Sequence, residues 1–383
     1  MAQTLTVVSG GGPAPEYSTL AGAVNAINSS DSTITISGTW GSADTTEFTV
    51  DGGGLTITAT GDSATNGIPE AHTDGVSSAY RLQVDGGTGG ALTISDTCTF
   101  KGFEIEHVGT GVSAEIFRAG GDNHTLTLDS MLLYFSSRTD QQDIIYTNSQ
   151  VVTINATNCV AYNAYRAFLD QWQNDNCTLN TNCCTFYDIG YSSSTSSRSG
   201  IFGMAGTGTH TWNSLNCILD TDPFSYAFVH NGGTNVANHD YQSCSSGTEA
   251  DTYLATMTVN ATGNEYDTDI EVGPGAAGKV SVIDVTGAGN AINLNLYDDS
   301  NNAALDFCQI APDAEGANSG LIMPSVDIAG NTRHPGAGNN YDCGAFSIQS
   351  APAGGGRIMS SLTAHGGLAG YGGIAGKGGG LAG

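Results

Sequence analysis

Three stretches decide the fold: VVTINATNC at residues 151–159, CTLNTNCC at 177–184 and THTWNSLNC at 209–217. Each contains an Asn (155, 180 and 213) that a Cys follows four residues later, at 159, 184 and 217. His239-Asp240 and Cys244 continue the pattern with the same offset. The intervals between these cysteines are 25, 33 and 27 residues. A position that recurs in this way indicates a repeat architecture whose loops vary while its strands keep their register.

Short alternating runs, separated by Gly, Asn, Asp, Ser and Thr, fill most of the chain around these stretches. Such runs are typical of strands. The exception is YSTLAGAVNAIN at 17–28, where Ser18 is a candidate N-cap and Leu20, Val24 and Ile27 share one helical face. We therefore expect one short helix there, and strands at 33–37, 55–59, 80–84, 92–95, 126–130, 151–155, 177–180 and 209–213.

The repeat predicts a solenoid in which each coil adds three short strands to parallel sheets. Equivalent side chains would stack at about 4.8 Å. Cys159, Cys184 and Cys217, with Cys244 as a further candidate, would form an internal thiol ladder. Asn155, Asn180 and Asn213 would lie at a corner, where Asn tolerates a left-handed bend. A β-sandwich is the alternative, although Asn231-Gly232-Gly233 is the only clear hairpin signal.

Two further segments resemble a known family. The opening helix followed by TITISGTW (33–40) and LTITATGD (55–62) resembles right-handed parallel β-helix proteins of the pectate-lyase-like superfamily. DIAGNTR at 327–333 with DCGAF at 342–346 is similar to a closing segment found in many of them, including phage and bacterial surface proteins. The resemblance spans roughly residues 5–348 and implies an all-β, right-handed, single-stranded parallel β-helix. It says little about activity, because this fold hosts lyases, hydrolases, adhesins and inert virion parts.

The domain organisation follows from these signals. Residues 1–30 are expected to form an N-terminal strand and capping helix, 31–350 the β-helix, and 351–383 a Gly-rich tail. The tail holds GGLAG at 366–370 and 379–383 and GGIAG at 372–376. A flexible linker is one interpretation. Regular apolar residues are unlike a solvated linker, so we expect an attachment element that buries Leu368, Ile374 and Leu381.

Composition excludes several function classes. The 383 residues contain 37 Asp+Glu against 10 Lys+Arg, a net charge of -27, which disfavours nucleic acid and anionic membranes as partners. The start of the chain shows no secretory signal and no stretch has the length of a membrane helix, so folding in a cytosol is expected. Nine cysteines without CxxC pairs favour buried free thiols over disulfides or zinc.

Candidate catalytic residues are scattered. A polysaccharide-cleaving enzyme on this fold needs carboxylates about 5–9 Å apart, or a base with positive charge beside it. Stacked coils would bring Asp143 and Asp170 together, and these two residues are the catalytic candidates. Solvated or turn-capping acids are the commoner case. The sets considered are Glu104, Glu106 and His107; Asp140 and Asp143 with Arg138; and Asp170 with Arg166 and Trp172.

Metal and glycan sites have weaker signals. Asp267, Asp269 and Glu271 alternate but lack the glycine-centred loop of a calcium motif, and no metal or other cofactor is expected. An exposed ladder of rings could bind a host glycan, with a buried core role as the alternative for about half of its members. These aromatic residues are Tyr162, Tyr165, Trp172, Tyr187 and Tyr191.

The sequence thus favours a non-enzymatic bacteriophage virion protein, a capsid-decorating or tail-associated β-helix that folds in the host cytoplasm. A homotrimer attached to the major capsid or tail protein is expected. The first alternative is a host-glycan-binding adhesin or polysaccharide-cleaving tailspike, and the second is a bacterial surface β-helix.

Overall fold

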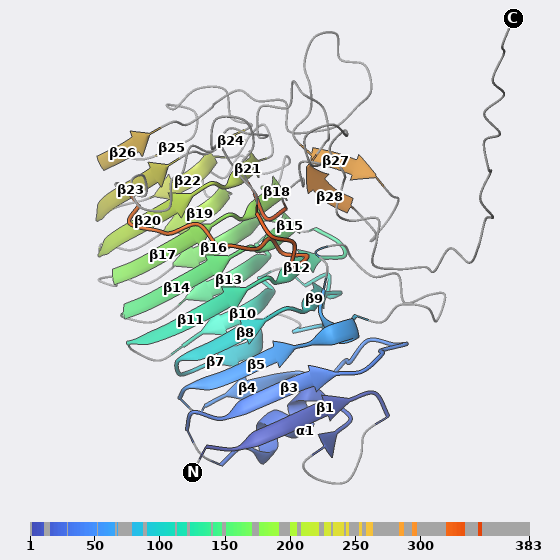
Figure 1. Ribbon diagram of the computed structural model, residues 1–383. Coiled ribbons are helices and arrows are strands. Elements are labelled where there is room, and N and C mark those ends of the chain that lie inside the picture. Colours follow the sequence, from blue (N-terminus) through green and yellow to red (C-terminus); the bar gives the residue numbers. More distant parts are fainter. Residues whose placement is uncertain are drawn as a thin grey trace, which may run out of the picture.

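The fold is all-β and is built from three parallel sheets (Figure 1). It was obtained as a computed structural model. The structure describes residues 2–10, 16–28, 30–51, 53–65, 67, 79–86, 90–111, 113–120, 123–138, 141–147, 151–170, 176–190, 200–204, 208–221, 226–230, 233–240, 243–244, 253–254, 258–262, 283–286, 293–296, 319–333 and 344–346.

Sheet A has eleven strands and is the longest. In spatial order it consists of β2 (Glu16–Tyr17), β1 (Thr4–Val8), β3 (Thr33–Ser37), β5 (Leu55–Ala59), β8 (Cys98–Lys101), β11 (His124–Asp129), β14 (Val151–Thr157), β17 (Asn176–Asn182), β20 (Thr209–Leu215), β23 (Thr234–Asp240) and β26 (Thr258–Thr262).

Sheets B and C have seven and eight strands. Sheet B consists of β6 (Arg81–Val84), β9 (Glu104–His107), β12 (Leu132–Phe135), β15 (Val160–Ala164), β18 (Thr185–Ile189), β21 (Ile218–Thr221) and β24 (Ser243–Cys244). Sheet C consists of β4 (Phe48–Val50), β7 (Gly90–Ile94), β10 (Glu115–Ala119), β13 (Asp143–Thr147), β16 (Arg166–Asp170), β19 (Gly200–Met204), β22 (Tyr226–His230) and β25 (Tyr253–Leu254).

Consecutive strands pass from sheet A to B to C, so β8, β9 and β10 make one coil and β11, β12 and β13 the next. Each strand pairs in parallel with its equivalent one coil away. This arrangement is compatible with a parallel β-helix and excludes the β-sandwich alternative, whose sheets are antiparallel. A separate antiparallel pair, β27 (Ile283–Thr286) and β28 (Asn293–Leu296), lies outside the three sheets.

A single left-handed residue turns the chain from sheet A into sheet B. The positions are Gly102, Ser130, Asn158, Cys183 and Asn216, with φ between 51° and 78°. Asn155, Asn180 and Asn213 lie three residues earlier, within the strands. The expectation that these three asparagines form the corner is therefore wrong. The spacing of the Asn and Cys positions matches the coils, but the left-handed residue that makes the bend is the one just before each cysteine.

The N-terminal end is closed by α1 (Leu20–Ala26), which buries Leu20, Ala23 and Val24 in the core. Its N-cap is Thr19, whose hydroxyl accepts from Gly22 N–H, one residue beyond the expected Ser18. Buried Asp44 accepts from the Leu20 N–H at 2.7 Å and from Tyr80 Oη at 2.8 Å, because a helix N-terminus favours a carboxylate. β1 pairs with β3, so residues 4–8 continue the same sheet.

A C-terminal strap, residues 319–333 with 344–346, crosses the corner between sheets A and B (orange-red in Figure 1). Ser319 N–H donates to Asp240, Asn182 Nδ2 donates to the Ile322 carbonyl, and Asn158 Nδ2 to the Val326 carbonyl. Successive strap residues thus bind successively earlier coils, from β23 to β14.

Candidate functional site

Asp143 and Asp170 are not register partners. They belong to neighbouring strands of sheet C, where Asp143 lies opposite Arg166 and Asp170 lies opposite Thr147. Four residues along a strand correspond to about 13 Å of backbone. The expectation that stacking brings the two together is wrong, because the register places them at opposite ends of the strands.

Asp143 instead belongs to a buried ion pair. Arg166 Nε and Nη2 donate to its two oxygens at 2.6 and 3.0 Å, the planar fork geometry of a bidentate pair. Asp143 is 2% exposed and Arg166 6%. Burial raises the pKa of Asp143 and the Arg166 guanidinium opposes that shift. The carboxylate is thereby held by protein groups and turned away from solvent.

A second pair lies beside it on the same face of sheet C. Glu115 is the register partner of Asp143, and Arg118 Nη2 donates to Glu115 Oε1 at 3.1 Å. Burial raises the pKa of Glu115, opposed by Arg118. The Arg118 guanidinium lies 5.2 Å from the ring centroid of Tyr146, within cation–π range. The sequence does not single out Glu115, because an alternating pattern predicts on which face of a strand a residue lies but not which segment covers that face.

Glu104 and Glu106 project from the same face of β9, as alternation predicts, while Ile105 between them is in the core. Tyr134 Oη donates to Glu104 at 2.5 Å. Gln83 Nε2 and Arg81 Nη1 contact Glu106 at 3.0 and 3.2 Å. Both glutamates are at most 1% exposed, so neither side chain is open to a substrate.

His107 faces the opposite way and packs on Phe135, with ring centroids 4.8 Å apart. Burial lowers its pKa, and Gly109 N–H donates to its Nδ1. Arg138, grouped in the sequence with Asp140 and Asp143, binds Asp188 at 2.6 Å. Asp140 lies outside the described residues.

The described members of the aromatic set are buried. Tyr162 stacks on Tyr134 at 4.6 Å, and Tyr162, Tyr165 and Tyr187 are 2%, 3% and 8% exposed. Tyr134 lies opposite Glu106, and Tyr162 and Tyr187 continue that row, so these rings stand on the outer side of sheet B and are covered there. The described rings thus form neither an exposed glycan-binding ladder nor part of the hydrophobic core. Trp172 and Tyr191 lie outside the described residues.

The three cysteines stack on the inner side of the corner. Cys159, Cys184 and Cys217 are free thiols, at most 2% exposed, and each follows a left-handed residue. The Cys184 N–H donates to Cys217 Sγ at 3.4 Å, and Cys184 Sγ donates to the Ala156 carbonyl. Burial raises the pKa of Cys184 and Cys217 well above the usual value, which keeps them as thiols.

Cys244 does not extend this ladder. It pairs with Leu219, two positions past the equivalent of Cys217. His239-Asp240 likewise aligns with Ser214-Leu215, and the true partner of Asn213 is Asn238. The four-residue offset from His239-Asp240 to Cys244 was therefore a coincidence of sequence.

The asparagines form a chain of amide hydrogen bonds on the outer side of sheet A. Each Nδ2 donates to the Oδ1 of the preceding coil: Asn180 to Asn155, Asn213 to Asn180, Asn238 to Asn213 and Asn260 to Asn238, at 2.7–2.8 Å. Five side chains are thus ordered in one line across five coils.

Residues of the DIAGNTR and DCGAF segments form a clasp. Arg333 Nη2 donates to Asn158 Oδ1 at 3.0 Å and to the Gly344 carbonyl at 2.8 Å. Asn331 N–H donates to Asp327 Oδ1, and the Ile328 N–H donates to the Ala345 carbonyl. The motif residues therefore close the strap on itself and on the corner, which is a structural role.

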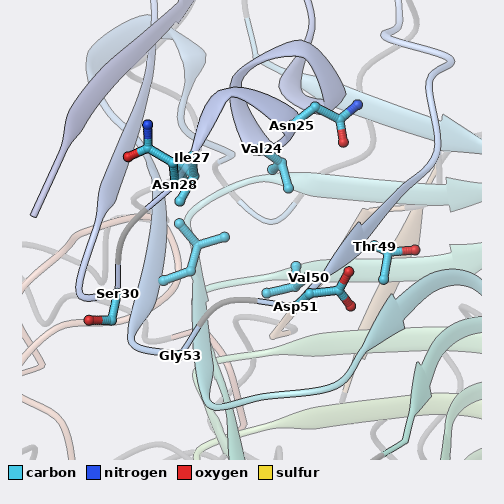
Figure 2. Close-up of a pocket in the computed structure, with 10 residues that line it drawn as sticks. Val24, Asn25, Ile27, Asn28, Ser30, Thr49, Val50, Asp51 and Gly53 are labelled. Atoms are coloured by element: carbon cyan, nitrogen blue, oxygen red, sulfur yellow. The ribbon is translucent and has the colours of Figure 1, made fainter.

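One pocket of about 420 Å³ lies between α1 and β4 among the described residues (Figure 2). Val24, Val50 and Leu55 supply apolar walls, while Asn25, Asn28, Ser30, Thr49 and Asp51 are polar and exposed. It contains none of the residues singled out as catalytic candidates.

Among the residues the structure describes, no group of three or more His, Cys, Asp or Glu has a metal-binding arrangement. No described helix has the length and apolarity to cross a membrane. Asp267, Asp269 and Glu271 lie outside the described part, as do Leu368, Ile374 and Leu381 of the tail. The chain matches no model of a known protein family, and a search of curated proteins finds no match.

Proposed function

We propose that the chain is a non-enzymatic structural protein of a bacteriophage virion, a right-handed parallel β-helix of the pectate-lyase-like kind that decorates the capsid or belongs to the tail. It folds in the host cytoplasm, assembles as a homotrimer and binds the major capsid or tail protein through its Gly-rich tail.

One observation carries this proposal: the carboxylates that catalysis on this fold would use are buried in pairs. Asp143 is held by Arg166, Glu104 by Tyr134, and Glu106 by Arg81. A general acid or base must come within hydrogen-bond reach of its substrate. Side chains that are 0–2% exposed and bound by protein partners are instead suited to stabilising the coil stack.

Other features support the same function. Buried free thiols suit folding in a reducing compartment. A charge of -27 keeps the protein away from packaged DNA. Residues 343–383 contain Arg357 and Lys377 but no Asp or Glu, so the tail differs in charge from the acidic body and suits an attachment role.

Deleting residues 354–383 tests the attachment. We expect unchanged far-UV circular dichroism, because the deletion leaves the described strands intact, and loss of incorporation into particles. A charge-matched control replaces the tail with a Gly/Ser segment that keeps Arg357 and Lys377. Incorporation of the truncated protein at the full-length level would contradict the role of the tail.

A glycan-cleavage assay tests the non-enzymatic assignment. Full-length protein is incubated with host capsular polysaccharides, and reducing ends or unsaturated uronates are measured. We expect no turnover. Turnover that Asp143→Asn or Glu115→Gln abolishes would replace the structural function with an enzymatic one.

A further inference from the structure

A continuous row of uncharged side chains runs along the outer face of sheet A. Register partners connect ten strands from β1 to β26. The first five positions are threonines and the last five asparagines, and none of the ten is buried. This neutral row consists of Thr4, Thr33, Thr56, Thr99, Thr127, Asn155, Asn180, Asn213, Asn238 and Asn260.

The rows on either side keep this character. One contains Thr125, Thr153, Thr178, Thr211, Val236 and Thr258. The other contains Thr6, Thr35, Thr58, Lys101, Asp129 and Thr157. Its two charged members, Lys101 and Asp129, form an ion pair with each other. Beyond Thr157 this row continues into Asn182, Leu215 and Asp240, which are buried, and at its other end Thr6 lies opposite Glu16 of β2. The named positions of the three rows therefore carry no net charge on a chain that carries -27.

The face has the dimensions of a protein interface. The central row has nine strand steps of about 4.8 Å, a length near 43 Å. The ten positions of this row and the six named on each side take up about 32 Å² each, roughly 700 Å² in total, which approaches the ~800 Å² that each partner buries in a standard-size interface. The strap binds Asn182 and Asp240 in the continuation of the Thr6 row, and these contacts leave the central row uncovered.

The asparagine half is also held in place before any partner binds. Each amide is fixed by a bond to the next coil, and the threonines are β-branched residues with restricted χ1. Association therefore costs little side-chain entropy at this face. Parallel in-register stacks of strands pack face to face in this manner, with asparagine ladders contributing to the contact.

We infer that this neutral face is where a second copy of the chain docks, sheet A against sheet A. A second copy has the same strand spacing of about 4.8 Å, so the side chains of the two rows can interdigitate in register over their full length. It also shares the high negative charge, and like-charged proteins approach most readily where neither surface is charged. The inference rests on the self-association proposed above and names its surface. Sheet A against sheet A is a twofold contact that pairs two copies, so on this point it replaces the proposed trimer with a dimer.

Charge insertion tests the docking. In the full-length chain, Thr56→Glu with Thr127→Glu places like charges on the row, and Thr49→Glu with Thr93→Glu makes the same change on paired positions of sheet C. Mass is measured by light scattering and sedimentation, with circular dichroism to verify folding. We expect the row variant to associate at least tenfold more weakly and the sheet C variant to match the unmodified chain.

A cross-link provides a second measurement for the case that the charged row variant fails to fold. Thr127→Cys adds one outward thiol, whereas the six described native thiols are buried. Mild oxidation should give a covalent dimer that the unmodified chain does not form.

Several outcomes overturn the docking. They are equal weakening by both charged variants, no weakening by either, or no cross-link at Thr127→Cys. A monomer that co-sediments with a neutral crystalline polysaccharide or with ice would assign the face to that occupant instead. A monomer that still enters particles would defeat this inference and the proposed trimer while leaving the virion role, whereas glycan turnover would defeat the non-enzymatic assignment and leave this inference standing.

Discussion

The outer faces of sheets A and C belong to the same coils but differ in the charge and burial of their polar side chains. The central outward row of sheet A is neutral, partly exposed and repeated from coil to coil. Sheet C also carries charged side chains that are buried and paired with an immediate neighbour, as in Asp143 with Arg166.

This difference separates two sources of stability. In a repeated neutral row, each coil adds a small and similar contribution to the free energy of unfolding, as expected for stacked repeats. In a buried charge pair, each charged group has lost its hydration and is compensated only by its partner. Removing one partner therefore causes a large loss of stability at that one site. The four predictions below test that separation, starting with the largest effect.

Asp143→Ala should be the most damaging of these changes. It leaves the buried Arg166 guanidinium without its bidentate partner, and removing one member of a buried pair costs about 3–5 kcal/mol. The free energy of unfolding in urea measures this. Lys101→Ala is the matched control on sheet A, because the pair that it removes is exposed and should contribute at most about 1 kcal/mol. An equal loss of unfolding free energy in the two variants would contradict the proposed difference between the two sheets.

Acid should destabilise the protein through the inner side of sheet A. Burial lowers the pKa of His239 to about 3, below its unfolded value. Between those two pKa values the unfolded chain binds a proton that the folded chain does not, so stability falls as the pH drops. From pH 7.5 to 4.5 this amounts to about 2–3 kcal/mol. Urea unfolding of the unmodified chain and of His239→Gln at both pH values isolates it, and equal pH dependence would refute the assignment.

Cys184→Ser tests the corner where sheets A and B meet. A buried hydroxyl with poorly matched partners should lower the free energy of unfolding by about 1–3 kcal/mol. Cys184→Ala is the control, since it removes the sulfur without adding polarity. Thiol labelling of the native chain should be slow at Cys159, Cys184 and Cys217. Rapid modification of all three would contradict the buried ladder.

Asn213→Ala should cost no more than Cys184→Ser, and Asn260→Ala should have the smallest effect of all. Asn213 donates to Asn180 and accepts from Asn238, so two hydrogen bonds are lost, at about 0.5–1.5 kcal/mol each. Asn260→Ala removes only one such bond among those seen, and should cost about half as much. Urea unfolding of both variants compares them. A greater loss of unfolding free energy for Asn260→Ala than for Asn213→Ala would show that the coils of the row do not contribute similar amounts to stability.

Much of sheet A could be predicted from sequence, because each of its coils repeats alternation between a buried and an exposed side. The runs at 33–37 and 55–59 coincide with β3 and β5, and the run at 151–155 lies within β14. The helix was placed correctly to within a few residues of α1.

Sheet C was harder to predict. Its strands are preceded by loops of variable length, so sequence distance did not reveal that Asp170 lies opposite Thr147. Glu115 gave no signal of its own, since nothing in its neighbourhood shows which segment buries it. Asp44 was missed for a similar reason, because its helix partner lies 24 residues away.

The strap changes how the coil stack can come apart. A stack of repeats with only neighbour contacts can fray from its last coil, one unit at a time. Here Arg333 is tied to Asn158, 175 residues away, and Ser319 to Asp240, 79 residues away. The outer coils are therefore bridged to inner ones, and opening the end first requires the clasp to release. Since the strap residues follow those of the three sheets in the chain, the strap can close only after the coils beneath it have formed, and we expect unfolding to be slow relative to the stability of any single coil.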